Sequence, residues 1–340
     1  MSENSQSVIH HVAVLGAGAW GTALAIHLAK AGHSISLWAH RTDHAEKLNQ
    51  ERENQRYLPN ISLPKNIIAT ASMAAALKYA EAVLVVVPSQ AFRKTLLELK
   101  PLMGCENMQV AWATKGFEPV TQKLLHEVAF EVLGDKASLT VLSGPTFAKE
   151  VAIGLPTAMV SASDIESQAE YWAELFWHDT FRMYTQSDVL GVEVGGAYKN
   201  IMAIATGISD GLKMGANARA ALVSRGMAEM MRLSEALGGQ AETMMGLAGL
   251  GDLVLTCTDD LSRNRRFGFG LAQGNLSTEE VMNEIGQVVE GVKAVKAVKK
   301  LAAKLGLDLP IMEQVFQLVE GMITPQQALH NLMSRSIKAE

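Results

Sequence analysis

The amino-acid sequence predicts an α/β protein whose first half forms a doubly wound parallel sheet and whose second half is all-α. In the first half, short apolar runs rich in β-branched residues alternate with helical patterns, up to about residue 186. Beyond that point such runs are few, and Ala, Met, Leu, Glu and Lys are frequent. Apolar strands separated by helices indicate a parallel sheet that helices cover on both faces. For a chain of 340 residues we expect two domains, residues 1–190 and 191–340.

The predicted strands are short runs, each bounded by Gly, Pro, Ser or Thr. They cover residues 11–15, 34–39, 82–87, 109–113 and 139–142, and residues 156–161 and 181–184 would add strands at one edge. Residues 20–31 are expected to form an amphipathic helix that ends at Gly32. In the second half we expect helices over residues 281–304, 314–320 and 326–333.

The composition excludes several classes of protein. Hydrophobic residues make up 48% of the chain and charged residues 19%, which argues against general disorder. The 30 basic and 35 acidic residues give a net charge of -5, which argues against a general nucleic-acid binder. The longest unbroken apolar run, residues 82–88, is far shorter than the ~20 residues that a membrane helix needs. We therefore expect no nucleic-acid partner and no integral membrane segment.

The expected location is the cytoplasm. The N-terminus has no basic stretch followed by an apolar core, so no signal peptide is predicted. The two cysteines, Cys105 and Cys257, lie far apart in the chain and match no metal or redox spacing, which suits a reducing compartment. The sequence also has no H-E-x-x-H motif and no paired C-x-x-C, so no metal site is predicted.

A glycine-rich turn is the clearest single motif. The stretch GAGAWG at residues 16–21 follows the first predicted strand and opens the first predicted helix. Gly16 permits a tight turn, Gly18 lets the backbone approach a pyrophosphate, and Gly21 lets helix and strand pack closely. The helix N-terminus then offers N–H donors and the positive end of its dipole to the phosphates. This context predicts a Rossmann-type dinucleotide site, and the alternative is a purely structural strand-to-helix turn.

The end of the second strand bears on the choice of coenzyme. An NAD-selective site usually has an acid there, about 20 residues after the glycines, to bind the ribose hydroxyls. Here the strand runs into His40 and Arg41, and the first carboxylate is Asp43. Arg41 is suited to pair with a 2′-phosphate and His40 to hydrogen-bond it, so the sequence favours NADP(H) and leaves NAD(H) open. The alternative is that both side chains simply face solvent.

Further clusters of polar residues are candidates for catalytic or ligand-binding sites. In the stretch GGAYKN at residues 195–200, Gly196, Lys199 and Asn200 fall on one face of a predicted helix. Each glycine weakens such a helix by about 1 kcal/mol relative to Ala, which suggests close approach by another segment or a ligand. The other clusters are TKG (114–116) and SGPTFA (143–148), which follow predicted strands, then GLGD (249–252), and SRNRR (262–266), the densest basic group of the chain.

Seven stretches together resemble the bacterial NAD(P)-dependent glycerol-3-phosphate dehydrogenases. They occur in the order of that family over nearly the whole chain, and they are GAGAWGTALA (16–25), ATKGFE (113–118), SGPTFAKE (143–150), GGAYKN (195–200), GLAGLGDLVLTCT (246–258), SRNRRFG (262–268) and GQVVEG (286–291). The resemblance implies a Rossmann domain followed by a helical domain. It also implies reduction of dihydroxyacetone phosphate to sn-glycerol 3-phosphate, which feeds phospholipid synthesis.

The resemblance further implies roles for individual residues. Lys199 matches the catalytic lysine of the family, and Lys115 and Asp252 match residues that flank it at the substrate. The implied substrate contacts are Lys115, Gly144, Thr146, Lys199, Asp252, Ser262, Arg263 and Asn264. Together with the glycine motif and the end of the second strand, the expected cofactor contacts are Gly16, Gly18, Ala19, Trp20, Gly21, His40, Arg41, Lys115, Ala148, Arg263, Val288 and Glu290. Ala19 stands where the family commonly has a serine, so a hydroxyl contact to phosphate would be missing.

These residue types suit the implied reaction. Hydride transfer to a ketone leaves negative charge on its oxygen, which needs a positioned proton donor. A lysine ammonium supplies both charge stabilisation and the proton, and burial or a nearby cation lowers its pKa toward a useful range. Asp252 would raise that pKa again and fix the direction of the amine. Arg263, with Ser262 and Asn264 beside it, would hold the substrate's phosphate.

Several alternatives stay open at this point. Asp252 could cap a helix instead, and Arg265 and Arg266 would form a solvated face or a dimer contact. A β-hydroxyacid or ketopantoate reductase type of dehydrogenase would share the architecture but would not require the SRNRRFG segment for a phosphate. A non-catalytic nucleotide sensor would have no need for Lys199, Lys115 and Asp252 together. The apolar helical half is compatible with a homodimer.

Overall fold

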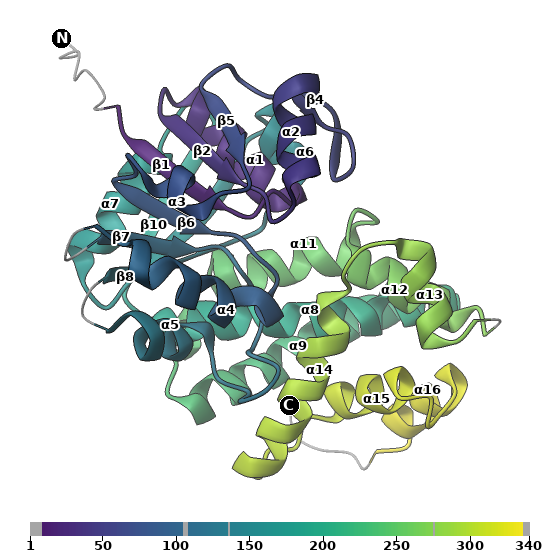
Figure 1. Cartoon of the computed structure of the whole chain (residues 1–340). Coiled ribbons are helices and arrows are strands. Elements are labelled where there is room, and N and C mark those ends of the chain that lie inside the picture. The colour runs from purple at the N-terminus through teal and green to yellow at the C-terminus, as the bar shows by residue number, and fades with distance from the viewer. Residues whose placement is uncertain (1–8, 105–107, 135–136, 275, 336–340) are drawn as a thin grey trace. The chain divides into compact units, whose positions relative to one another are not determined.

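The computed structural model describes residues 9–104, 108–134, 137–274 and 276–335, and these form two compact units (Figure 1). The first unit takes in the described residues of Met1–Thr114, Ala129–Leu142 and Thr146–Ser187. The second takes in those of Lys115–Val128, Ser143–Pro145 and Asp188–Glu340. Cys105 lies outside the described residues, whereas Cys257 is a buried free thiol of the second unit.

The first unit contains an eight-stranded sheet in the order β10-β9-β8-β7-β6-β1-β2-β5. Its strands are β1 (His11–Leu15), β2 (Ser34–Trp38), β5 (Ile67–Thr70), β6 (Ala82–Val85), β7 (Met108–Trp112), β8 (Ala137–Ser143), β9 (Thr157–Ala162) and β10 (Phe181–Gln186). Every pair of these strands with a determined register is parallel. The predicted parallel sheet is therefore confirmed, including the two additional strands at one edge.

Burial on both faces explains why the central strands are continuous apolar runs. All of β6 and all but the first residue of β1 are buried, because helices cover the sheet. The helices of this part of the chain are α1 (Ala19–Lys30), α2 (Thr42–Glu51), α3 (Met73–Leu77), α4 (Ser89–Leu99), α5 (Leu125–Leu133), α6 (Ala148–Ile153) and α7 (Glu166–Phe176), with a 3₁₀ turn η1 (Lys100–Leu102).

Three short strands were not predicted from the sequence. One is β5, at the edge beside β2, and the other two are β3 (Glu53–Asn54) and β4 (Leu58–Ser62), which pair as an antiparallel hairpin. β3 has only two residues, and β4 is mostly exposed and contains Pro59, so neither leaves an apolar run that stands out from loops. The β3–β4 hairpin follows α2 directly, and it contributes to the functional site described below.

The part of the second unit that follows residue 187 is built from helices and the loops between them, and no strand occurs among residues 188–274 and 276–335. It appears mostly in green and yellow in Figure 1. Its helices are α8 (Val189–Gly211), α9 (Gly215–Leu237), α10 (Ala241–Met244), a π-helical turn η3 (Leu247–Gly251), α11 (Asp252–Thr258), α12 (Arg263–Ala272), α13 (Thr278–Ile285), α14 (Glu290–Leu305), α15 (Pro310–Val319) and α16 (Pro325–Met333). None of the described helices combines the length and hydropathy that crossing a membrane requires.

Helix α8 is the central element of the second unit, because nearly all of its residues are buried among α9, α11, α12 and α14. Its closest neighbour is α12. A Cβ atom on Gly207 would lie 2.0 Å from the carbonyl oxygen of Arg265, and a Cβ on Gly268 would lie 2.1 Å from that of Ile204. The backbones of the two helices are therefore in direct contact, which only glycine at these positions permits.

One predicted helix was wrong. Residues 281–304 form two helices instead of one, because α13 ends at Ile285 and α14 begins at Glu290. The break occurs at Gly286, whose φ of 64° is the left-handed conformation that commonly ends a helix. The last two predicted helices exist but begin earlier than expected, each with a proline in its first turn, Pro310 and Pro325.

Candidate active site

A buried carboxylate joins two lysines in the second unit. Asp252, the first residue of α11, is fully buried, and its Oδ2 accepts a hydrogen bond from Lys115 Nζ at 2.6 Å. Its Oδ1 accepts from Lys199 Nζ on α8. Lys115 Nζ also donates to the carbonyl oxygen of Gly144 at 3.1 Å. The structure therefore brings together the three residues that sequence analysis placed at the reacting centre.

Burial changes the acid strength of Lys199. Its pKa is lowered from 10.5 to about 7, chiefly because desolvation penalises the ammonium form. The charge of Asp252 acts in the opposite direction, and the charge of Lys115 lowers the pKa further. An amine with a pKa in this range exchanges its proton readily near neutral pH, which is what general acid–base catalysis needs.

Two glycines of α8 make room for this cluster. A Cβ on Gly195 would lie 2.4 Å from the carbonyl oxygen of Ala248, in the π-helical turn η3 that leads to Asp252. A Cβ on Gly196 would lie 3.1 Å from the hydroxyl oxygen of Ser143 and 3.5 Å from Cδ of Lys115. The two glycines inside a helix therefore serve close approach by another segment, as the sequence suggested, and π-helical turns are frequent at functional sites.

The surroundings of Asp252 show that it is not a helix cap. Gly251 occupies the N-cap position of α11, and the carboxylate of Asp252 is used by the two lysines. Thr256, one helical turn later, donates its hydroxyl to the backbone oxygen of Asp252 at 2.6 Å. The hydroxyl of Ser143 is buried and has no hydrogen-bond partner among the residues that the structure describes.

The N-terminus of α12 carries the residues predicted to bind phosphate. Ser262 is the N-cap, and its Oγ accepts from the backbone N–H of Arg265 at 3.3 Å. Asn264 donates through Nδ2 to Asn200 Oδ1 at 2.8 Å and accepts through Oδ1 from the N–H of Gly291 at 2.9 Å. Asn264 thereby links α12 to α8, beside Lys199, and to the first turn of α14.

Arg263 lies beside the start of α14. Its Nη1 donates to Gln287 Oε1 at 3.0 Å, and burial lowers the pKa of its guanidinium while the charge of Glu290 raises it. Burial likewise raises the pKa of Glu290, against the charges of Lys293 and Arg263. Val288, between Gln287 and Glu290 in the chain, is 37% exposed. The predicted cofactor positions 263, 288 and 290 thus belong to neighbouring elements of the second unit.

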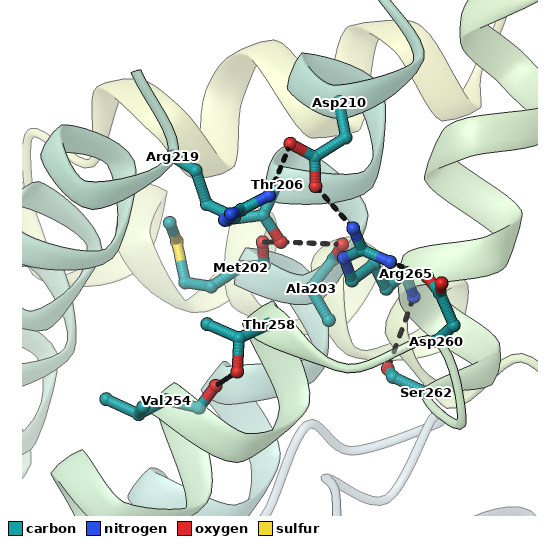
Figure 2. Close-up of polar contacts among 10 residues, drawn as sticks. All are labelled: Met202, Ala203, Thr206, Asp210, Arg219, Val254, Thr258, Asp260, Ser262 and Arg265. Atoms are coloured by element: carbon teal, nitrogen blue, oxygen red, sulfur yellow. Dashed lines mark hydrogen bonds and ion pairs between the residues drawn. The ribbon is translucent and has the colours of Figure 1, made fainter. Parts of the chain in front are cut away.

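The expectation that Arg265 lies on a solvated face or a dimer contact was wrong. Arg265 is buried, and its Nη2 donates to Asp210 Oδ2 at 2.6 Å while its Nη1 pairs with Asp260 (Figure 2). Arg219 donates to the other oxygen of Asp210 at 2.9 Å. Close packing of α12 on α8 turns Arg265 toward the last turn of α8, whereas Arg266, the next residue, is exposed.

The glycine-rich turn of the first unit has the geometry that a pyrophosphate needs. Gly16 has a φ of 126°, and a Cβ there would lie 2.3 Å from the carbonyl oxygen of Val86. A Cβ on Gly21 would lie 1.9 Å from the carbonyl oxygen of Gly16, so helix and turn are in contact. Gly18 faces open space instead, with nothing within 4 Å of where a Cβ would stand. Because α1 also has no side-chain cap, its N–H groups and this cradle fit a phosphate ligand.

The residues after β2 are arranged differently from the simple expectation. His40 is exposed, and its ring meets the Trp38 ring edge-on at 6.2 Å between centroids. Arg41 is engaged by Asp43, with Nε 2.9 Å from Oδ1 and a second contact from Nη2 to Oδ2. This hydrogen-bonded pairing raises the pKa of Arg41 and lowers that of Asp43. The guanidinium expected to meet a 2′-phosphate already holds a carboxylate.

The remaining predicted positions lie at the starts of helices in the first unit. Ala19 and Trp20 open α1, and the indole Nε1 of Trp20 is buried without a partner among the described residues. Ala148 is the first residue of α6, and Thr146 precedes it in the loop after β8.

Sequence reasoning missed one buried residue that supports the glycine turn. Asn54, in β3, is 1% exposed, and its Nδ2 donates to Ala17 O at 3.0 Å and to Thr22 Oγ1 at 2.7 Å. No local pattern marks an asparagine that reaches back over thirty residues of chain. Thr256 could have been found, because it lies four residues after Asp252 and therefore on the same helix face.

Each unit therefore contains one kind of functional group arrangement. The first has a parallel sheet whose first strand leads into an open, glycine-lined cradle at an uncapped helix N-terminus. The second has a buried amine that titrates near neutrality, held by a carboxylate and flanked by a second amine. A dinucleotide cradle in one unit and a buried amine of lowered pKa in the other are features of the NAD(P)-dependent oxidoreductases.

Comparison with known proteins identifies the family. The model of the NAD-dependent glycerol-3-phosphate dehydrogenase N-terminus matches residues 11–169, and that of the NAD-dependent glycerol-3-phosphate dehydrogenase C-terminus matches residues 188–330. The chain belongs to the NAD-dependent glycerol-3-phosphate dehydrogenase family.

Similar proteins span almost the same length. The glycerol-3-phosphate dehydrogenase [NAD(P)+] of Hydrogenovibrio crunogenus is 60% identical over 331 residues, covering 97% of this chain and 96% of that protein. The protein of the same name from Stenotrophomonas maltophilia is 50% identical over 329 residues, with the same coverage. The crystal structure of glycerol-3-phosphate dehydrogenase from Coxiella burnetii superposes with a TM-score of 0.92 at 45% identity, covering 96% of this chain and 99% of that one.

The buried Arg265 pairing generates a stability prediction. Arg265→Met should lower the free energy of unfolding by about 3 kcal/mol, because it removes one partner of a buried ion pair and leaves Asp210 with Arg219 alone. Arg266→Met is the matched control and should change it by less than about 0.5 kcal/mol, since its side chain is exposed. Urea unfolding followed by circular dichroism measures both, and equal effects of the two substitutions would contradict the assignment.

Proposed function

We propose that this protein is an sn-glycerol-3-phosphate dehydrogenase that reduces dihydroxyacetone phosphate to sn-glycerol 3-phosphate, a precursor for phospholipid synthesis. The observation that carries the proposal is the buried cluster of Lys199, Asp252 and Lys115 in a chain of this family. Residues 1–190 would bind the coenzyme and residues 191–340 the substrate, although Lys115 and Gly144 group with the helical unit. The names of the 60% and 50% identical relatives support the same activity.

Lys199 donates the proton in the reductive direction and accepts it in the oxidative direction. When bound, the reduced nicotinamide supplies the hydride that the ketone carbon receives. The ammonium of Lys199 donates its proton to the ketone oxygen as negative charge develops there, and a pKa of about 7 keeps both the ammonium and the neutral amine populated at neutral pH. Asp252 holds the amine in direction, and Lys115 orients or polarises the same oxygen. In the oxidative direction, neutral Lys199 accepts the proton from the alcohol.

The substrate's phosphate is assigned to the start of α12. Arg263 offers a guanidinium, and the helix N-terminus offers N–H donors beside Ser262 and Asn264. The full set of proposed substrate contacts is Lys115, Gly144, Thr146, Lys199, Asp252, Ser262, Arg263 and Asn264. The proposed coenzyme contacts are Gly16, Gly18, Ala19, Trp20, Gly21, His40, Arg41, Lys115, Ala148, Arg263, Val288 and Glu290.

Three further properties belong to this proposal. NADP(H) is the favoured coenzyme, because the residues after β2 are basic and no acid precedes Asp43 there. A homodimer is supported by exposed apolar side chains of the helical unit, such as Val254 at 41% and Phe269 at 46% exposure. The cytoplasm is the proposed location, since its reducing conditions keep the thiol of Cys257 free.

Substrate choice tests the proposed activity. Oxidation of NADPH, followed at 340 nm, should show a kcat/KM for dihydroxyacetone phosphate at least ~100-fold above that for dihydroxyacetone, because charge-assisted hydrogen bonds to the phosphate are lost with the smaller ketone. Ketopantoate serves as the test of the rival dehydrogenase class. Efficient turnover of ketopantoate with no preference for the phosphorylated ketone would overturn the proposal.

Removal of the amine tests the proton donor. Lys199→Ala should lower kcat by at least ~100-fold, the usual contribution of a general acid, while the dissociation constant for NADPH measured by fluorescence stays unchanged. Lys304→Ala, which removes an exposed lysine of the helical unit, is the control and should leave both quantities alone. Near-normal turnover in Lys199→Ala would assign the proton to another group.

The pKa of Lys199 predicts a pH profile. For ketone reduction, kcat/KM should be constant below about pH 7 and fall tenfold per pH unit above it, because the required ammonium is lost as the pH rises through the lowered pKa. For alcohol oxidation the dependence is reversed, since the neutral amine is the base. Asp252→Asn removes a group that raises this pKa, so the break should move to lower pH. A break that appears only near pH 10 would show an amine in ordinary solvent.

A further inference from the structure

A pocket of about 340 Å³ lies in the first unit, next to the loop that connects β2 to α2. Residues of α2 and of the β3–β4 hairpin line it with charges of both signs, and among them are Arg41, Asp43, Lys47, Glu51, Arg56 and Tyr57. Neither the phosphate turn nor the cluster at Lys199 uses these side chains, apart from the role given to Arg41.

The pocket is tied to the glycine-rich turn by one side chain. Asn54 lines the pocket, and its Nδ2 donates to the carbonyl oxygen of Ala17, between Gly16 and Gly18, at 3.0 Å. His44 of α2 in turn contacts Asn54 Oδ1 at 3.2 Å. In a dinucleotide the adenosine ribose follows the pyrophosphate, and in this fold it lies at the end of the second strand. The pocket is therefore placed for the ribose and whatever its 2′ position carries.

The Arg41–Asp43 ion pair contains both groups that can recognise the ribose 2′ position, one for a hydroxyl and one for a phosphate. A ribose 2′-hydroxyl calls for a carboxylate, and a 2′-phosphate calls for a guanidinium. Here Asp43 and Arg41 supply the two groups, and they bind each other through Nε and Nη2, the two-point arrangement that a guanidinium also uses for phosphate. Their side chains are 54% and 57% exposed, so an incoming anion displaces the carboxylate at modest cost.

Asp43 also has a second cation within reach. Lys47 lies four residues later on α2, one turn along the same face. The hydrogen bond from Arg41 is the main cause that lowers the pKa of Asp43, and the charge of Lys47 acts in the same direction. When a phosphate takes Arg41, the carboxylate therefore keeps a neighbouring positive charge.

We propose that Asp43 is a specificity-determining residue for the coenzyme. It accepts from the 2′-hydroxyl of NAD(H), and it competes with the 2′-phosphate of NADP(H) for Arg41. The carboxylate thereby limits the preference that Arg41 alone would create, and the chain can use either coenzyme. This inference rests on the proposed function, because it concerns the dinucleotide site of the same dehydrogenase.

Binding of NADP+ and NAD+ to the full-length protein, measured by isothermal titration calorimetry, tests the proposal without relying on turnover. The ratio of the NAD+ to the NADP+ dissociation constant should rise about fivefold in Asp43→Asn, because the phosphate no longer displaces or repels a carboxylate. In Arg41→Gln the same ratio should fall about tenfold, because the charge-assisted contacts to the phosphate are lost.

A charge control comes from α4. Glu98→Gln removes the same charge from an exposed pair with Lys94 and should leave the ratio unchanged. A ratio within twofold of wild type in Asp43→Asn, or an equal rise in Glu98→Gln, overturns the role of Asp43 while the proposed function stands. Wild-type protein that binds neither dinucleotide overturns the proposed function as well, so the two failures are distinguishable.

Discussion

The proposed chemistry of this molecule depends on one buried carboxylate shared by two amines. Asp252 is fully buried, which would be very costly for a lone charge, and Lys199 and Lys115 compensate it from opposite oxygens. When Lys199 is protonated, two positive charges on one negative leave a surplus of positive potential, which would stabilise an oxygen that gains electron density. The same desolvation that makes the cluster costly brings the pKa of Lys199 to about 7.

Much of the helical unit can be understood as support for that cluster. The amine of Lys199 belongs to the most buried helix, and the carboxylate belongs to the start of α11, after a π-helical turn. Gly195 lets α8 touch that turn, and Gly196 leaves space for the stem of Lys115. The two glycines thus lower the stability of the helix locally and permit close packing around the site.

The elements of this fold that could be predicted from the sequence are those that leave a local pattern. Apolar strands, the GAGAWG turn and the all-helical second half were predictable, because each leaves a local pattern. The two-residue strand β3 leaves none, and the break between α13 and α14 was marked only by Gly286.

Long-range pairing was the harder part to predict. Arg265 is buried because Asp210 and Asp260 meet it from other segments, and no spacing within SRNRR indicates that. Asp43 lies only two residues after Arg41, but the sequence does not show that its carboxylate accepts a hydrogen bond from the guanidinium, because that depends on the side-chain conformations. The meeting of positions 115, 199 and 252 was anticipated through family resemblance, since their separation in the chain carries no geometric signal.

The glycine contact between α8 and α12 has a consequence for the length of molecule that the site can accept. With Gly207 and Gly268 pressed backbone to backbone, the two helices cannot slide or spread without losing that contact. The proposed proton donor at position 199 and the proposed phosphate ligand at position 263 belong to these same two helices, so the packing fixes the spacing of their backbone positions. We therefore expect a compound one carbon longer or shorter than the proposed substrate to fit these two proposed contacts less well.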